Sequence, residues 1–235
     1  NVKPKGPEKP GKPGEPGEPV GPARKKRKKR KREHTVGPLL FHPESHSYTI
    51  EDRPVPSVSE IIAPYGDDIP ENSSQALAVE AAAERGTVCH ALLESFLKGG
   101  ADVEYPSSYT AYVQAIQLFL SEHDVLPAAV ETPLYSARLG VAGTPDLLCE
   151  FDGTLALLDY KFVSQVAKTK VKAQLNAYRL MYEDNGVYVE ALYAVQFLPD
   201  GAYRLYPVKI DDTEFLTALE LHRLKNKKHA RGRID

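Results

Sequence analysis

Two carboxylates and a lysine are spaced in this sequence as the ligands of a hard metal ion could be. Asp146 follows the turn-forming residues Gly143–Pro145 and precedes an apolar stretch, while Asp159 and Lys161 end the next apolar stretch. Because side chains alternate between the faces of a strand, Asp159 and Lys161 share one face. The run Leu155–Leu158 before them is typical of a strand covered on both faces, where a charge needs a compensating partner. A divalent cation, which prefers oxygen ligands, would be such a partner.

This combination suits the hydrolysis of phosphodiesters. A divalent cation lowers the pKa of a bound water, and the cation and Lys161 would stabilise charge on the phosphate in the transition state. Each part also has a simpler interpretation. Asp146 could be an ordinary turn residue, and Asp159 with Lys161 could form a surface ion pair on an edge strand.

Two helical pairs add polar groups to the candidate site. His90 and Glu94 are four residues apart, as are Gln174 and Tyr178, so each pair lies on one face of its predicted helix. By themselves such pairs are most often surface or core-edge contacts. Together with the carboxylates and the lysine they predict a single site.

The strands expected to position these residues alternate with helices. Asp152–Gly153 is a strong two-residue hairpin turn between the strands that carry the carboxylates. The strand patterns cover Leu39–Ile50, Ala128–Tyr135, Asp146–Phe151, Leu155–Phe162, Tyr188–Leu198 and Tyr203–Ile210.

Helix signals complete a mixed α/β order around a central sheet. Ser57 and Glu60 have the spacing of a capping box. Ala76–Glu84 is helical in pattern, and Gly86 is expected to interrupt it, so that Thr87 caps a second helix ending at Gly99–Gly100. Further helices are expected over Ser107–His123, over Val171–Glu183 and after Asp211–Thr213.

Composition narrows the class of protein. Of 235 residues, 42% are hydrophobic and 26% charged, which excludes a wholly disordered chain. No apolar run reaches the length of a membrane helix, and no signal peptide is evident at the start of the sequence. Cys89 and Cys149 are too few for a four-cysteine cluster, and we expect two free, buried thiols in an intracellular protein.

The charge is distributed very unevenly. Residues 1–33 hold 13 basic and 4 acidic residues, and the remainder holds 17 basic and 28 acidic, so the two parts carry +9 and −11. We expect residues 1–36 to form a disordered arm that binds DNA, serves as a nuclear address or only keeps the protein soluble. Its nine consecutive cations are Arg24, Lys25, Lys26, Arg27, Lys28, Lys29, Arg30, Lys31 and Arg32.

The ordered set of motifs resembles the PD-(D/E)XK nuclease superfamily. Pro145-Asp146 followed by Asp159-Tyr160-Lys161 is similar to its signature. Arg85-Gly86-Thr87 with His90 and Glu94, and Gln174 with Tyr178, resemble its RecB-like, phage-type exonuclease branch. The resemblance covers about residues 40–210 and implies a restriction-endonuclease-like core, a central mixed β-sheet flanked by helices, within a nuclease domain at 37–235.

The resemblance also implies roles for individual residues. Asp146 and Asp159 would be the main ligands of Mg²⁺ or Mn²⁺, joined by the backbone carbonyl of Tyr160, and His90 would bind or flank the ion. Lys161 would position or deprotonate the attacking water.

Other residues are candidates for contact with the substrate. Gln174 and Tyr178 would touch the DNA strand or orient the lysine. Two acidic residues, Glu94 and Glu131, are weaker candidates that could be plain surface charge. Phosphate contacts from the segment before Gln174 could come from Lys170 and Lys172, for which a solvated face is an equally good interpretation.

The expected function is metal-dependent exonuclease activity on linear DNA, in phage recombination or DNA processing. A structure-specific endonuclease and a non-catalytic DNA-binding module tethered by the basic arm are the alternatives. There is no Walker motif, so a helicase or recombination partner would be a separate protein.

We expect no iron–sulfur cluster and no membrane association. The location would be a bacterial cytoplasm for a phage protein and the nucleus for a eukaryotic one. The sequence leaves the oligomeric state and the polarity open.

Overall fold

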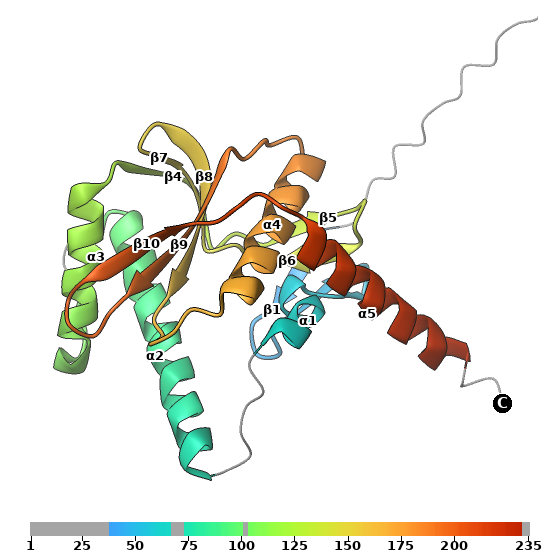
Figure 1. The fold of residues 1–235 in the computed structure, drawn as a ribbon, viewed down its shortest axis with the longest axis horizontal. Helices are drawn as coiled ribbons and strands as arrows, with labels where there is room; N and C mark the ends of the chain where they lie inside the picture. The colour runs from blue at the N-terminus through green and yellow to red at the C-terminus, as the bar shows by residue number, and fades with distance from the viewer. Residues whose placement is uncertain (1–37, 67–72, 101–102, 232–235) are drawn as a thin grey trace, which may run out of the picture. The chain divides into compact units, whose positions relative to one another are not determined.

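A mixed five-stranded sheet forms the centre of the computed structural model (Figure 1). The structure describes residues 38–66, 73–100 and 103–231, without the side chains of 73–80 and 228–231, so the predicted arm lies outside the described residues. The strand order is β10–β9–β8–β7–β4, in which only β8 and β9 are parallel. The strands are β4 (Val125–Val130), β7 (Leu147–Phe151), β8 (Thr154–Lys161), β9 (Ala191–Phe197) and β10 (Tyr203–Pro207).

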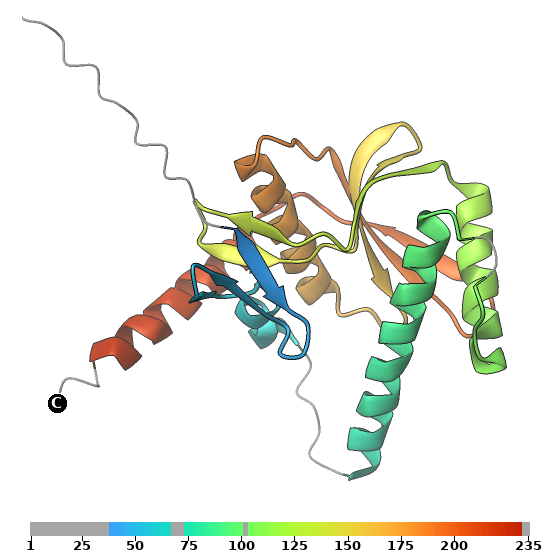
Figure 2. The ribbon, with the colours of Figure 1, turned by 180° about the vertical axis from the view of Figure 1, so that it is seen from behind.

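Helices cover both faces of this sheet, as Figures 1 and 2 show. This arrangement confirms the predicted α/β class with a central mixed sheet. The short 3₁₀ segments are Ala63–Tyr65 and Ser107–Tyr109. The α-helices are α1 (Val58–Ile61), α2 (Ser73–Leu97), α3 (Thr110–Glu122), α4 (Lys168–Asp184) and α5 (Thr213–Arg231). None of the described helices is long and apolar enough to cross a membrane.

Strand β8 contributes to a different core on each face. Leu157 is buried in a cluster with residues of α1, α4 and α5, whereas Leu158 and Tyr160 belong to a cluster with residues of α2 and α3. Since side chains alternate along the strand, Asp159 and Lys161 lie on the face covered by α4. A strand buried on both faces therefore carries the two charges, as the sequence predicts.

The hairpin between β7 and β8 forms at the expected turn. Asp152 and Gly153 have φ angles of 47° and 82°, which suits a primed two-residue turn, and the register pairs Leu147 with Leu158. This register brings Asp146, just before β7, opposite the end of β8. The hairpin thus places the two predicted carboxylates on neighbouring chain segments.

The predicted break in α2 is wrong. The helix runs without interruption through Gly86, and the Thr87 hydroxyl donates a hydrogen bond to the carbonyl of Ala83 within the helix. A helical glycine costs only about 1 kcal/mol relative to alanine, which the packing of this long helix can offset. The end of the helix is as predicted, because Gly99 has a φ of 88° and Gly100 N–H bonds to Ser95 O.

The strand predicted over Ala128–Tyr135 is also wrong as a single element. It is divided into β4 and a short strand β5 (Leu134–Ser136), which pairs with β6 (Val141–Gly143) in a separate sheet. The division falls at Glu131, whose φ of 44° is left-handed and ends the extended conformation.

A third sheet comes from the region predicted as one strand at Leu39–Ile50. It contains β1 (Leu39–His42), β2 (Ser47–Ile50) and β3 (Arg53–Val55), in antiparallel order. The helix start at Ser57 is confirmed, since the Ser57 hydroxyl accepts a hydrogen bond from Glu60 N–H. A bridge between Ser57 and Ala142 links this region to β6.

Two glycines make a matched pair for a test of packing. A Cβ added to Gly143 would lie 2.6 Å from Tyr178 Cε1 and 3.2 Å from Val58 Cγ2, both in buried side chains. We expect Gly143→Ala to lower the free energy of unfolding by about 1–3 kcal/mol through overpacking. Gly86→Ala, where a Cβ meets nothing within 4 Å, should raise it by up to about 1 kcal/mol. Urea denaturation followed by circular dichroism measures both, and equal effects would contradict this packing.

Candidate metal centre

Three side chains from distant parts of the chain converge beside β7. His90 comes from α2, Glu131 from the loop after β4, and Asp146 from the residue before β7. One ligand atom of each lies within 4.8 Å of the others. His90 Nδ1 is 3.2 Å from Glu131 Oε1 and 3.9 Å from Asp146 Oδ2. A cation could therefore be bound by all three at once.

The geometry around Asp146 depends on β8. The backbone N–H of Tyr160 donates a 2.7 Å hydrogen bond to Asp146 Oδ2, which orients the carboxylate. One residue earlier, Asp159 is only 2% exposed, and neither of its oxygens has a hydrogen-bond partner among the described residues. Its Oδ2 does form an ion pair with Lys161 Nζ at 2.6 Å.

These carboxylates fit a divalent cation. Buried carboxylate oxygens are normally satisfied by hydrogen-bond donors, but Asp159 Oδ1 has none among the described residues, and Oδ2 has only Lys161. Burial raises the pKa of Asp159 to about 6 despite the attraction of Lys161, and Asp146 contributes to the rise. Burial likewise raises the pKa of Asp146, against the attraction of His90 and Lys161. A bound cation would remove this penalty.

The two basic groups of the centre are held in their charged forms. Burial lowers the pKa of His90, but Asp146 and Glu131 outweigh it and bring the value to about 9. Burial also acts against Lys161, and Asp159 and Asp146 raise its pKa above the ordinary value. At neutral pH His90 therefore donates its Nδ1–H to Glu131, and a metal that uses His90 must displace that proton.

Metal binding should consequently depend on pH. We expect the apparent dissociation constant for Mn²⁺ to fall about tenfold per pH unit from pH 6.5 to pH 8.5, because each ion displaces one proton from His90 below pH 9. The folding stability of the metal-free protein should change with pH in the opposite direction. The raised His90 pKa stabilises the fold at low pH, and this contribution is lost as the pH rises through about 9.

Isothermal titration calorimetry at pH 6.5, 7.5 and 8.5 measures this dependence. The variant His90→Gln should bind Mn²⁺ more weakly and with little change in affinity over the same interval. A wild-type affinity that does not vary with pH would show that His90 is not a ligand.

Helix α4 brings the predicted pair Gln174 and Tyr178 to the centre. Lys161 Nζ lies 3.5 Å from Gln174 Oε1, so the ammonium group is held between Asp159 and Gln174. Tyr178 is buried, and burial raises the pKa of its hydroxyl well above its usual range although Gln174 hydrogen-bonds to it. Tyr178 is therefore neutral and serves as a hydrogen-bonding group.

A cleft of about 640 Å³ opens onto this centre. Its walls come from α2, α4, the start of α1, the β1–β2 hairpin and the loops on either side of β5 and β6. Seventeen residues line it: Phe41, His46, Tyr48, Ser57, Ser59, Gly86, Thr87, His90, Ala91, Glu94, Glu131, Pro133, Gly143, Thr144, Asp146, Gln174 and Tyr178. Six of the site residues that the sequence predicts therefore line one cleft: His90, Glu94, Glu131, Asp146, Gln174 and Tyr178.

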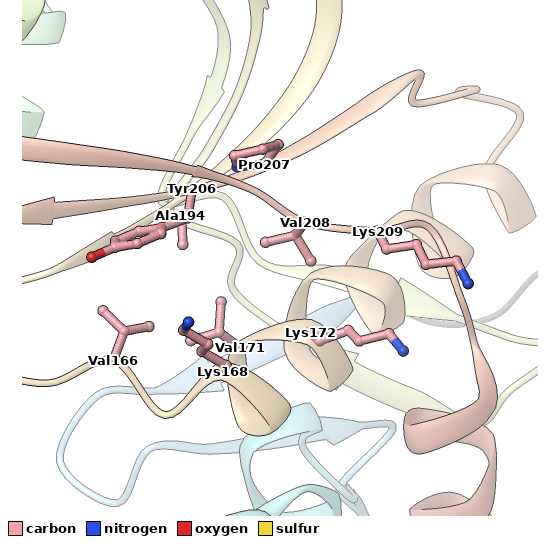
Figure 3. Close-up of a pocket in the computed structure, with 9 residues that line it drawn as sticks. All are labelled: Val166, Lys168, Val171, Lys172, Ala194, Tyr206, Pro207, Val208 and Lys209. Atoms are coloured by element: carbon pink, nitrogen blue, oxygen red, sulfur yellow. The ribbon is translucent and has the colours of Figure 1, made fainter.

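The two predicted lysine contacts are in different positions. Lys170 is spaced four residues before Gln174 and so shares its helix face, but it is not among the residues that line the cleft, and its Nζ lies beside Gly66. Lys172 instead pairs with Asp211 and Glu214 at 2.8 and 2.7 Å. It lines a separate pocket of about 230 Å³ next to β9 and β10, which Figure 3 shows. The structure does not bring Lys172 to the cleft.

Other residues near the centre have structural partners. Glu94 lines the cleft but pairs with Lys98, one turn further along α2. Arg85 Nε donates a hydrogen bond to the carbonyl of Phe162, which ties α2 to the end of β8. The ring of Phe162 packs edge-on against His90, with centroids 5.4 Å apart. From the sequence, Glu131 is only a weaker candidate, and no local pattern indicates that it lies among the ligand atoms.

Comparison with known proteins finds only distant similarity to solved structures. No model of a protein family matches the chain, and no curated protein sequence matches it. Among solved structures, the chain is similar to an alkaline exonuclease, LHK-Exo, from Laribacter hongkongensis. The identity is 14%, with 75% of this chain and 93% of that chain covered, and the TM-score is 0.34. LHK-Exo in complex with dAMP gives 13% identity, coverage of 76% and 94%, and a TM-score of 0.34.

Proposed function

We propose that this protein is a metal-dependent deoxyribonuclease of the PD-(D/E)XK type that acts as an exonuclease on linear DNA. The observation that carries the proposal is the convergence of Asp146 and Asp159 with Lys161 at the end of β8. A buried carboxylate, Asp159, with an oxygen that has no donor, next to the partly buried Asp146 and a charged lysine, is an expensive arrangement for a merely structural role. Phage recombination or DNA processing would be the biological setting.

Four side chains and one backbone carbonyl would form the metal site. Asp146, Asp159, His90 and Glu131 would hold Mg²⁺ or Mn²⁺, with the carbonyl of Tyr160 as a further ligand. When bound, the cation supplies Lewis acidity and lowers the pKa of a water molecule.

Lys161 is placed to act on the substrate. Its ammonium group, held by Asp159 and Gln174, would orient the attacking water and stabilise the charge that develops on the phosphate. The raised pKa of Lys161 favours a charged, electrostatic role over that of a general base in the metal-free state. Tyr178 and Lys170 on the same face of α4 would contact the substrate strand.

Digestion of end-labelled linear DNA and covalently closed circular DNA, with Mg²⁺, Mn²⁺ or EDTA, tests the proposal. We expect loss of linear DNA only, dependent on the cation, and release of mononucleotides from one labelled end. Cutting of the circles would identify an endonuclease instead. Binding without cleavage in either metal would contradict the enzymatic proposal and favour a DNA-binding module.

A further inference from the structure

An aromatic ladder forms one wall of the cleft. Phe41 and Tyr48 are directly opposed on β1 and β2, with ring centroids 5.0 Å apart, and the ring of His46 lies 6.0 Å from Phe41. Tyr48 is buried, Phe41 half-buried and His46 exposed, so the three rings lead outward from the interior. All three line the cleft. We call Phe41, His46 and Tyr48 the aromatic rim.

The aromatic rim is tied to the metal centre. The Tyr48 hydroxyl hydrogen-bonds to Thr144 Oγ1 at 2.7 Å, and Thr144 is only two residues before Asp146. The rings and the carboxylate are therefore held by the same short segment. If one chemical group of a ligand were bound at the metal centre, the neighbouring group of the same ligand would contact the aromatic rim.

Hydrogen bonds brace the hairpin that carries the aromatic rim. His46 has a left-handed φ of 47°, and hydrogen bonds join Ser45 Oγ to Ser47 Oγ and His42 Nε2 to Thr49 Oγ1 across the hairpin. Together with the contacts between the rings and the hydrogen bond of Tyr48, they favour one arrangement of the rim, which would reduce the conformational entropy lost on stacking.

The charge of the cleft indicates what the rim would bind. Glu94, Glu131 and Asp146 line the cleft, and the only cationic side chain among its lining residues is His90, which faces Glu131 and Asp146, so the lining offers phosphates few attractive charges away from the metal centre. Affinity for a nucleic-acid strand must then come largely from contacts without charge. Stacking of bases on aromatic rings is such a contact, and it tolerates any base sequence.

We propose that the aromatic rim stacks an unpaired nucleobase next to the phosphate bound at the metal centre. The substrate would thus be a single-stranded or frayed DNA end rather than intact duplex. This inference rests on the proposed function, and it assigns to the β1–β2 hairpin the recognition of the base. Phe41 is the principal stacking residue, since its ring is partly exposed to the cleft while that of Tyr48 is buried.

Binding of two single-stranded oligonucleotides tests the inference, one with natural bases and one with abasic residues throughout. Fluorescence anisotropy is measured in EDTA and, with the Lys161→Met protein to prevent cleavage, in Mg²⁺. Wild type should bind the natural strand at least about tenfold more tightly than the abasic one. Phe41→Leu, which keeps an apolar side chain, should lose that preference and leave the abasic affinity unchanged. Leu40→Ala is the matched control, because Leu40 is 49% exposed on the opposite face of the same strand and should have no effect.

The outcomes separate this inference from the proposed function. Hydrolysis in Mg²⁺, together with equal binding of natural and abasic strands by wild type and Phe41→Leu, would overturn the inference alone. A base preference that depends on Phe41, without hydrolysis in any metal, would overturn the proposed function alone. Failure of wild type to bind either strand would overturn the inference as well.

Discussion

Replacing Lys161 by methionine is expected to slow DNA hydrolysis by about 10³-fold or more while leaving metal binding intact. Methionine has a similar length and no charge, so the loss is that of the ammonium group held between Asp159 and Gln174. Groups that stabilise charge in the transition state contribute about 10²–10³-fold each, and positioning of water adds to this. Affinity for Mn²⁺ should not fall, because Lys161 competes with the cation for Asp159.

Single-turnover digestion of end-labelled linear DNA, with calorimetric titration of Mn²⁺, measures both effects. Lys209→Met is the control, since Lys209 is 81% exposed and lines the pocket by β9 and β10 instead of the cleft. We expect that control to retain the wild-type rate. Loss of activity in Lys161→Met of less than tenfold would remove this lysine from the mechanism.

Replacing Asp146 by asparagine should abolish stabilisation by metal. A ligand that binds the folded state at a hundred times its dissociation constant adds about 2.7 kcal/mol, which corresponds to a melting temperature higher by about 5–10 °C for a chain of this size. Asparagine can still accept the hydrogen bond from Tyr160 N–H, so the local structure should persist. Activity should fall with the loss of the metal.

Without metal, we expect Asp146→Asn not to lower the melting temperature. Because the folded state raises the Asp146 pKa, the ionised carboxylate is disfavoured there at neutral pH, and removing the charge should not lower the metal-free melting temperature. Glu150→Gln is the control, as Glu150 is exposed on β7 and should leave the metal-induced shift unchanged. Thermal denaturation of wild type and both variants, with and without Mn²⁺, measures these melting temperatures. A full metal-induced shift in Asp146→Asn would exclude Asp146 as a principal ligand.

Local patterns were sufficient for the strands at the heart of the site. The Asp152–Gly153 turn and the alternation in β8 depend only on neighbouring residues, so the hairpin and the shared face of Asp159 and Lys161 follow from the sequence. The same holds for the end of α2 at Gly99. In each case the backbone conformation is imposed by the residue type itself.

Contacts between distant parts of the chain determine the features of the site that local sequence patterns do not predict. Gly86 remains helical although its intrinsic preference is to interrupt, because Cys89 and Leu93 after it pack in the core and Arg85 just before it hydrogen-bonds to the carbonyl of Phe162. Glu131 enters the metal centre through a left-handed backbone after β4, which no local pattern indicates. Lys172 is held away from the cleft by Asp211 and Glu214, about 40 residues further along the chain.

The two faces of β8 also make the protein intolerant of errors in strand alignment during folding. A slip by one residue would turn every side chain of β8 to the opposite face. Asp159 and Lys161 would then enter the largely aromatic layer of Tyr160, Phe162 and Phe197 and lose the contacts with Asp146 and Gln174 that they have on the native face. Even a paired buried charge is costly without further polar contacts, so a misaligned chain would be disfavoured. The charged residues of the site thus help to specify the native alignment of the strand that carries them.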